Sequence, residues 1–173
     1  MRTRTPLAAT ALLTLTIGAA AAPAETSRSA DRKITAAGVG QVKLGRTFTS
    51  LRAAGLVGRL RPGCELGGPD TRSARLKAPL KGFVDLTTRQ RPRKVRSISI
   101  TGGATARGVG IGGTIAQIKA AYPKAKVDHG TEDVFGITLV KIPKDGGGRI
   151  HFAVDVRSKK ITRIGVPSIP FCE

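Results

Sequence analysis

One segment near the start of the chain occurs a second time, 67 residues later, with the same spacing of its key residues. The stretch 42–54, VKLGRTFTSLRAA, returns as 109–121, VGIGGTIAQIKAA. The first Val, one Gly, the Thr and the Ala pair are identical, and the other apolar positions are exchanged in kind. A repeat of this length predicts two copies of one supersecondary unit, and a fold that is set by their pairing.

Each copy is expected to open with a short extended segment and a short helix. The extended segments end at Gly45 and Gly112, and a threonine follows two residues later in both copies. The hydroxyl groups of Thr47 and Thr114 can accept a hydrogen bond from a free backbone N–H group, so we predict both as helix N-caps. Gly55 is expected to end the first helix, and Pro123 the second.

Strands are predicted after each helix. In the second copy, β-branched and alternating apolar residues favour strands over 134–142, 150–156 and 161–166. In the first copy, matching patterns at 84–86 and 94–100 are joined by a longer turn, with eight residues over 87–94 against four over 157–160. The segment 61–69 has no counterpart and is predicted to be a loop insertion.

The fold class expected from these patterns is α+β. Neither copy holds enough apolar residues to bury a helix and three strands alone. We therefore predict two tandem helix-plus-antiparallel-meander repeats that form a shared sheet, with two short helices on one face. Repeat 1 would span 34–103 and repeat 2 would span 104–173, joined at Gly102-Gly103 in one compact domain.

The N-terminus is typical of an export signal. Arg2 and Arg4 precede an uncharged run of apolar and small residues over 6–22, and Ala22-Pro23-Ala24 is a cleavage-site pattern. We predict a signal peptide over 1–24, a flexible leader over 25–33, and a secreted or cell-envelope location with no membrane span after signal cleavage. The alternative is an anchor that stays uncleaved.

The two cysteines, Cys64 and Cys172, both follow the predicted signal peptide. Export to an oxidising compartment favours one disulfide between them, and two unpaired buried thiols are the alternative. Their spacing matches neither a redox motif nor a structural zinc site.

The chain is strongly basic, with a formal net charge of +19, and the charge is unevenly distributed. Residues 25–103 hold 17 Lys/Arg and 5 Asp/Glu, whereas residues 104–173 hold 11 and 6. Such a charge favours polyanions and anionic surfaces, although biased composition is the alternative explanation. Basic side chains without interleaved aromatic residues do not indicate specific nucleic-acid recognition.

The candidate anion-binding residues are concentrated in the long turn of repeat 1. Guanidinium groups suit phosphate and carboxylate oxygens. The alternative is a solvated turn whose charges prevent another strand from pairing with the edge of the sheet. The basic residues of this stretch are Arg89, Arg91, Arg93, Lys94 and Arg96.

The doubled pattern resembles known exported domains. Leu44-Gly45-Arg46-Thr47 with Leu51, and Ile111-Gly112-Gly113-Thr114 with Ile118, are similar to the SmpA/OmlA (BamE-like) group. The doubled layout is similar to that of the β-lactamase inhibitor protein family. The resemblance implies helices paired with an antiparallel sheet, and a role in protein binding rather than catalysis. It carries over no inhibitory residue, and the chain has no cysteine at the predicted cleavage site for a lipid anchor.

No motif in the sequence predicts catalysis, a cofactor or a metal site. The glycine-rich stretch 108–114 lacks the ending of a phosphate loop, so we interpret it as a structural turn before a helix. His151 is expected on the solvated face of a strand, and His129 in a turn beside acidic residues without metal-ligand spacing. Asp85 and Asp155 occupy matching positions, where each is expected to have a structural role, such as pairing with a basic neighbour.

Three functional hypotheses follow from these observations. The first is an exported, non-enzymatic protein that binds an anionic envelope polymer or an acidic protein. The second is an inhibitor-like protein that binds a secreted or periplasmic enzyme. The third is a hydrolase with an unrecognised site. The oligomeric state is not indicated.

Overall fold

The structure, a computed structural model, describes residues 32–145 and 148–171. Its strands are β1 (Ile34–Thr35), β2 (Gly38–Val39), β3 (Val42–Lys43), β4 (Val57–Pro62), β5 (Arg72–Leu76), β6 (Lys81–Leu86), β7 (Val95–Gly102), β8 (Thr105–Ala106), β9 (Val109–Gly110), β10 (Lys126–Asp128), β11 (Ile137–Asp145), β12 (Gly148–Asp155) and β13 (Ile161–Val166). Its helices are α2 (Phe48–Ala53), α3 (Ile115–Ala121), α4 (Glu132–Phe135) and a 3-10 turn, η1 (Glu65–Gly67).

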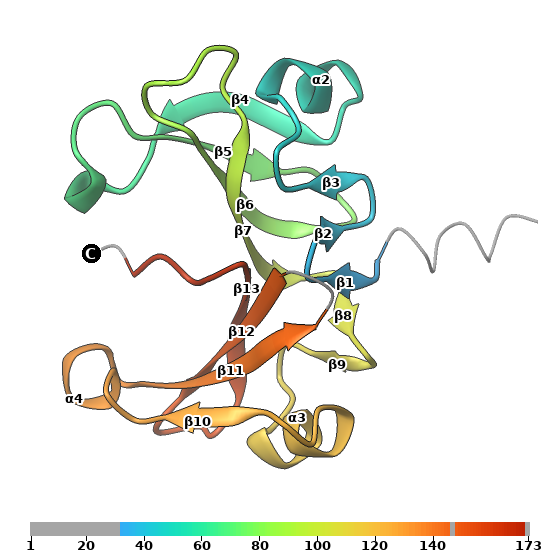
Figure 1. Cartoon of the computed structure of the whole chain (residues 1–173), viewed down its shortest axis with the longest axis vertical. Helices are drawn as coiled ribbons and strands as arrows, with labels where there is room; N and C mark the ends of the chain where they lie inside the picture. Colours follow the sequence, from blue (N-terminus) through green and yellow to red (C-terminus); the bar gives the residue numbers. More distant parts are fainter. Residues whose placement is uncertain (1–31, 146–147, 172–173) are drawn as a thin grey trace, which may run out of the picture.

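An antiparallel sheet of eight strands, in the order β10-β11-β12-β13-β7-β6-β5-β4, runs through the molecule (Figure 1). The strands β4 to β7 form one meander and β10 to β13 form another, and the last strand of each lies in the middle of the sheet. There β7 pairs with β13, with Ile98 opposite Val166 and Ile100 opposite Ile164. This arrangement establishes the predicted α+β class with a large antiparallel sheet and few helices.

One face of the sheet carries the main core. Val84, Ile98, Phe152 and Ile164 lie on this face and are fully buried. Leu51 from α2 and Ile118 from α3 join the same cluster, as do buried residues of the small β1–β3 and β8–β9 sheets. A single apolar cluster therefore extends across both meanders, which predicts one cooperative unfolding transition.

Both predicted helix N-caps are confirmed. The Thr47 hydroxyl accepts from the Ser50 N–H group at 3.2 Å, and the Thr114 hydroxyl accepts from the Gln117 N–H group at 3.4 Å. Each threonine follows a glycine, Gly45 or Gly112, whose positive φ of 79° or 83° lies in the left-handed region that favours glycine. The same spacing of glycine and threonine therefore builds the same turn-and-cap geometry at both places.

Replacing Thr47 or Thr114 with Ala is expected to lower the free energy of unfolding by about 1 kcal/mol, because one N–H group of a short helix loses its acceptor. Urea unfolding of the purified chain measures this change. Thr49→Ala is the matched control, since Thr49 is exposed within α2 and is not its N-cap. Equal losses in the cap and control variants would show that the caps contribute nothing specific.

The opposite face of the sheet, called here the open face, carries Phe83, Asp85, Ser99 and Ala153. The segment 167–171 lies against this face, where Ile169 packs with Leu139 and Ala153. The aromatic rings of Phe171 and Phe135 stack with their centroids 4.7 Å apart.

The structure corrects the predicted start of one strand. Residues Val134 and Phe135 belong to the short helix α4, which ends at Gly136 in the left-handed conformation, and β11 begins only at Ile137. A short apolar run fits a helix and a strand equally well, and no local signal separated the two. The last predicted strand, 161–166, is confirmed.

The expectation that His151 is solvated is wrong, because its side chain is only 9% exposed. His151 lies opposite Gly165 in the sheet, and Ser168 and Ile169 pack directly against that glycine. Burial lowers the pKa of His151, and the positive charges of Lys141 and Arg149 act in the same direction. The returning C-terminal segment thus covers a position that strand periodicity assigned to solvent.

The two matching aspartates have the expected structural role, and a serine rather than a basic residue is the hydrogen-bond partner of each. Asp85 accepts a hydrogen bond of 2.7 Å from the Ser97 hydroxyl, within the open face. Asp155 accepts from the backbone N–H and the hydroxyl of Ser158, both at 2.7 Å, and so closes the turn between β12 and β13. In both places, the donor is a serine on the same hairpin.

Candidate anion-binding surface

The first half of the molecule holds far more cations than it can neutralise. Residues 32–103 contain 16 Lys/Arg, and the only acids among them are Glu65, Asp70 and Asp85. In the second half, the ion pairs between described residues include Lys141 with Asp128 and His129 with Glu132. Among the residues that the structure describes, no lysine or arginine of 32–103 lies in an ion pair. The positive charge of the first half is therefore open to solvent and to any anion that approaches.

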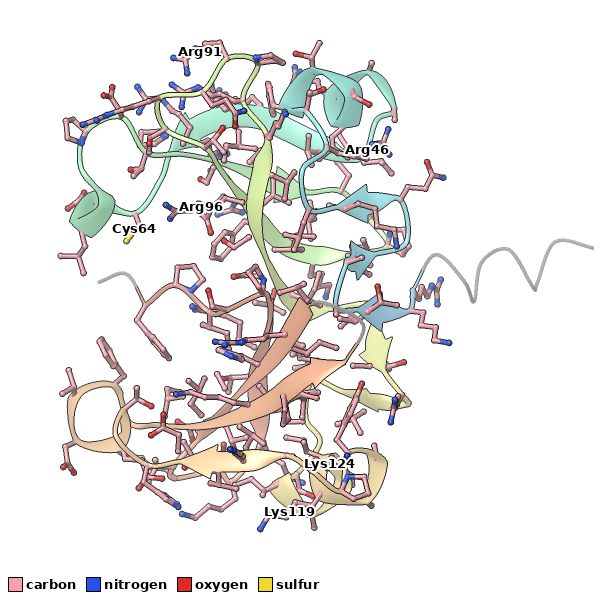
Figure 2. The ribbon with its side chains drawn as sticks, viewed as in Figure 1. Arg46, Cys64, Arg91, Arg96, Lys119 and Lys124 are labelled. Atoms are coloured by element: carbon pink, nitrogen blue, oxygen red, sulfur yellow. The ribbon has the colours of Figure 1, made fainter. Side chains whose placement is uncertain are left out.

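The predicted turn is the loop 87–94 between β6 and β7, at one end of the sheet (Figure 1). Arg89 and Arg91 are exposed there, and Figure 2 shows Arg91 at the outer end of the molecule. Arg91 donates through Nη1 to the carbonyl groups of Thr88 and Gln90, at 3.1 and 3.4 Å. These local bonds restrict the side chain to the tip of the loop.

Arg93 has a different role from its neighbours, because it is half-buried and holds the loop together. Its Nη1 group lies within hydrogen-bond distance of the carbonyl groups of Thr87 and Thr88, at 3.1 and 3.2 Å. It also donates to the carbonyl of Asp70 at 3.2 Å, which ties loop 87–94 to the loop before β5. Desolvation lowers the pKa of Arg93, and the positive charges of Arg91 and Arg72 lower it further.

Arg72 belongs to this surface, although sequence analysis did not select it. It lies at the start of β5, opposite Leu86, which directly precedes the loop. Its Nη1 group donates to the carbonyl groups of Pro69 and Thr71, each at 2.7 Å. Only the register between β5 and β6 places it beside Arg93, and no local motif encodes that register. We call Arg72, Arg89, Arg91 and Arg93 the arginine cluster.

The other two predicted residues lie apart from this cluster. Lys94 forms an isolated bridge with Thr47, so it sits against the beginning of α2. Arg96 is exposed and is labelled in Figure 2 on the side of Cys64, well away from Arg91. Arg96 and Arg163 favour the ionised form of Asp85, but burial dominates and raises the pKa of that carboxyl group.

The open face is hollowed in two places. One hollow has a volume of about 780 Å³ and is lined by Arg61, Arg75, Phe83 and Asp85, among others. A smaller hollow of about 270 Å³ is lined by residues that include Phe135, Arg163 and Phe171. Three of the six aromatic residues of the chain, Phe83, Phe135 and Phe171, thus lie on this face.

The acidic turn around His129 does not assemble a metal site. His129 Nδ1 lies 2.6 Å from Glu132 Oε1, while Asp128 accepts from Lys141 instead of facing the same point. The Thr138 hydroxyl and His129 lower the pKa of Glu132, and the Lys141 ammonium and the Gly130 N–H group lower that of Asp128. Within 32–145 and 148–171, no group of three or more His, Cys, Asp or Glu residues could hold a metal ion.

The predicted disulfide involves a residue that lies outside the described range. Cys64 precedes η1, and its Sγ atom is 4.0 Å from the carbonyl oxygen of Phe171. Cys172 follows Phe171 directly in the chain but is not among the described residues. The approach of Phe171 to Cys64 supports the pairing, which stays a prediction.

None of the helices in the described part of the chain has the length and apolar character needed to cross a membrane. No family model, no curated protein and no solved structure matches the sequence or the fold.

Proposed function

We propose that this chain is an exported, non-enzymatic binding protein that takes an anionic envelope polymer or an acidic protein through the basic residues of its first half. The arginine cluster carries this proposal. Its guanidinium groups come from the loop 87–94 and from the start of β5, and they are close enough for Arg91 and Arg72 to lower the pKa of Arg93. An anion that enters this cluster relieves the mutual repulsion of the three charges.

The contacts of the cluster leave it suited to an incoming anion. Arg91, Arg93 and Arg72 donate through Nη1 to backbone carbonyl groups, which orient the side chains without neutralising their charge. A guanidinium group has five N–H donors, so each retains donors for phosphate or carboxylate oxygens. The carbonyl contacts thus reduce the conformational entropy that these long side chains lose when a ligand binds.

The double variant Arg89→Gln/Arg91→Gln is expected to weaken binding of polyphosphate, or of polyglutamate as an acidic-protein probe, by about fivefold to tenfold. Both side chains are exposed and Arg93 stays in place, so the loop should keep its fold. Isothermal titration calorimetry at low ionic strength measures the change.

The matched control is Arg157→Gln/Lys160→Gln in the shorter turn between β12 and β13, which removes the same charge from exposed positions. The control is expected to retain binding within about twofold, since only the long-range field is changed. Equal losses in the two variants would contradict a site at loop 87–94 and leave only bulk charge.

We also infer that the two halves are tandem copies of one unit, as the BamE-like and inhibitor-like resemblance implies. The inference is supported by the recurring order of elements, in which β3, α2 and β4–β7 match β9, α3 and β10–β13. Thr47 and Thr114 cap the corresponding helices. The arginine cluster would then be an elaboration of one copy, because loop 87–94 is twice as long as its counterpart at 157–160.

The second candidate function, binding of a secreted enzyme as an inhibitor does, is favoured by the open face. Phe83 and Phe171 are only partly buried there, and Phe135 is 37% exposed. Partly exposed apolar side chains around two hollows are typical of a protein-binding surface. Binding of an acidic protein that persists at high salt and survives Arg89→Gln/Arg91→Gln would favour this function over the first.

A further inference from the structure

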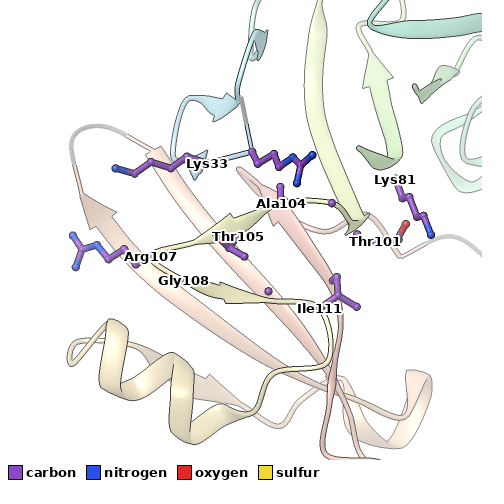
Figure 3. A pocket seen from close by; sticks show the side chains of 12 residues that line it. Lys33, Lys81, Thr101, Ala104, Thr105, Arg107, Gly108 and Ile111 are labelled. Atoms are coloured by element: carbon purple, nitrogen blue, oxygen red, sulfur yellow. The ribbon is translucent and has the colours of Figure 1, made fainter. Parts of the chain in front are cut away.

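A basic groove lies where the two halves join, away from the arginine cluster. It has a volume of about 1140 Å³ and is lined by Arg32, Lys33, Lys81 and Arg107, together with Thr101, Thr105 and several glycines. None of the described residues that line it is acidic. Figure 3 shows Lys33 and Arg107 toward one end and Lys81 with Thr101 toward the other. The cations therefore border the length of the groove.

Backbone pairing holds the walls of the groove in position. The Thr105 N–H group donates to the carbonyl of Arg32 at 3.0 Å, and Lys33 forms a parallel bridge with Thr105. This pairing joins the beginning of the described chain to β8. Sequence analysis placed Arg32 and Lys33 in the leader, and only this long-range pairing brings them beside Lys81 and Arg107.

Arg107 is held at its place by the end of α3. Its Nη1 group donates to the carbonyl of Ala121 at 3.3 Å, and its guanidinium carbon lies 4.7 Å from the centroid of the Tyr122 ring. A cation at the C-terminal end of a helix is favourably placed against the carbonyl groups there. The groove thus has a fixed guanidinium group and two exposed lysine side chains, Lys33 and Lys81.

The chemistry of the groove fits a chain of closely spaced phosphates. Gly102, Gly103, Gly108 and Gly110 contribute no side chains, so an extended ligand can approach the backbone closely. None of the described residues that line the groove is aromatic, so none of them can stack on sugar rings or bases. The recognition available is charge along its length and the hydroxyl groups of Thr101 and Thr105, which suits a ligand with many anionic groups and small neutral links.

We infer that this groove is a second anion-binding site, which takes a linear phosphate-bearing polymer along the junction of the two halves. The site is distinct from the arginine cluster. A negative result for the groove therefore does not refute the proposed function of loop 87–94, and the reverse also holds.

The test compares Lys33→Gln/Lys81→Gln with Lys119→Gln/Lys124→Gln by titration with short-chain polyphosphate. The four lysines are exposed, and Figure 2 shows Lys119 and Lys124 at the α3 end of the molecule, so both variants lose two charges and neither disturbs the core. The groove variant is expected to bind polyphosphate about fivefold to tenfold more weakly, and the control within about twofold of the parent. Circular dichroism confirms that both variants keep the sheet.

Three further outcomes decide the assignment. Equal weakening in the groove and control variants would overturn the groove as a site. Equal affinity of the parent for polyphosphate and for polygalacturonate would overturn the preference for phosphate, because a uronate chain carries carboxylates on sugar rings. Loss in the groove variant with none in Arg89→Gln/Arg91→Gln would support the groove and contradict the arginine cluster, and the reverse result would do the opposite.

Discussion

Replacing Phe152 with Ala is expected to lower the free energy of unfolding by about 3–5 kcal/mol. Phe152 is 0% exposed and lies on β12, opposite Val140 and Ile164 in the sheet. Its ring is tilted against Tyr122, with the centroids 6.1 Å apart. Truncation removes the apolar contacts of a fully enclosed side chain and leaves a cavity in a packed region.

Denaturant unfolding of the purified chain measures this loss. One cooperative transition with an unchanged slope is expected, because the cluster that contains Phe152 also contains Leu51 of the first half. Phe135→Ala is the matched control, since Phe135 is 37% exposed and its removal should cost much less. Two separate transitions, with only one of them shifted, would contradict a core shared between the halves.

Breaking the predicted Cys64–Cys172 disulfide is expected to destabilise the chain by up to about 4–5 kcal/mol. The bond would close a loop of 107 intervening residues, and in the chain-entropy model such a closure removes much of the freedom of the unfolded state. Cys64→Ser, Cys172→Ser and the double variant should therefore lose the same amount, because either substitution removes the single bond.

Thiol labelling of the oxidised native protein provides the direct check on this bond. The disulfide predicts no label without reductant and two labels after reduction and unfolding. Two labelled thiols in the native, unreduced protein would refute it. So would additive losses from the two single substitutions, since two independent buried thiols would each contribute separately.

The features that sequence predicted well are those encoded within a few residues. Thr47 and Thr114 act on donors three residues away, and Gly45 and Gly112 set the turn just before them. The strand 161–166 follows a polar turn, and its β-branched residues favour extended backbone. Such local signals are sufficient to place α2, α3 and the central hairpins.

The features that sequence missed depend on contacts between distant segments. His151 is buried because the segment 167–171 returns over the open face, and no pattern around residue 151 reports that return. One missed feature is local instead: Val134 and Phe135 continue the apolar run of β11 in sequence, but they belong to the helix α4, which ends at Gly136.

The candidate binding surfaces were only partly predictable for the same reason. The basic run of loop 87–94 is visible in the sequence, but strand register adds Arg72 and separates Arg96 from the loop. The groove was not visible, because Arg32, Lys33, Lys81 and Arg107 meet only through the pairing of β1 with β8 and the end of β7. Charge composition indicated a polyanion partner, and only the fold locates the charges.

The salt dependence of polyphosphate binding tests the central claim of anion binding by the first half most directly. The logarithm of the apparent affinity of the parent is expected to fall linearly with the logarithm of salt concentration, because each phosphate contact releases counterions and salt screens the exposed charges. Arg89→Gln/Arg91→Gln should reduce that slope by about two, and Arg157→Gln/Lys160→Gln should leave it unchanged. An affinity independent of salt, or the same slope in both variants, would contradict the claim.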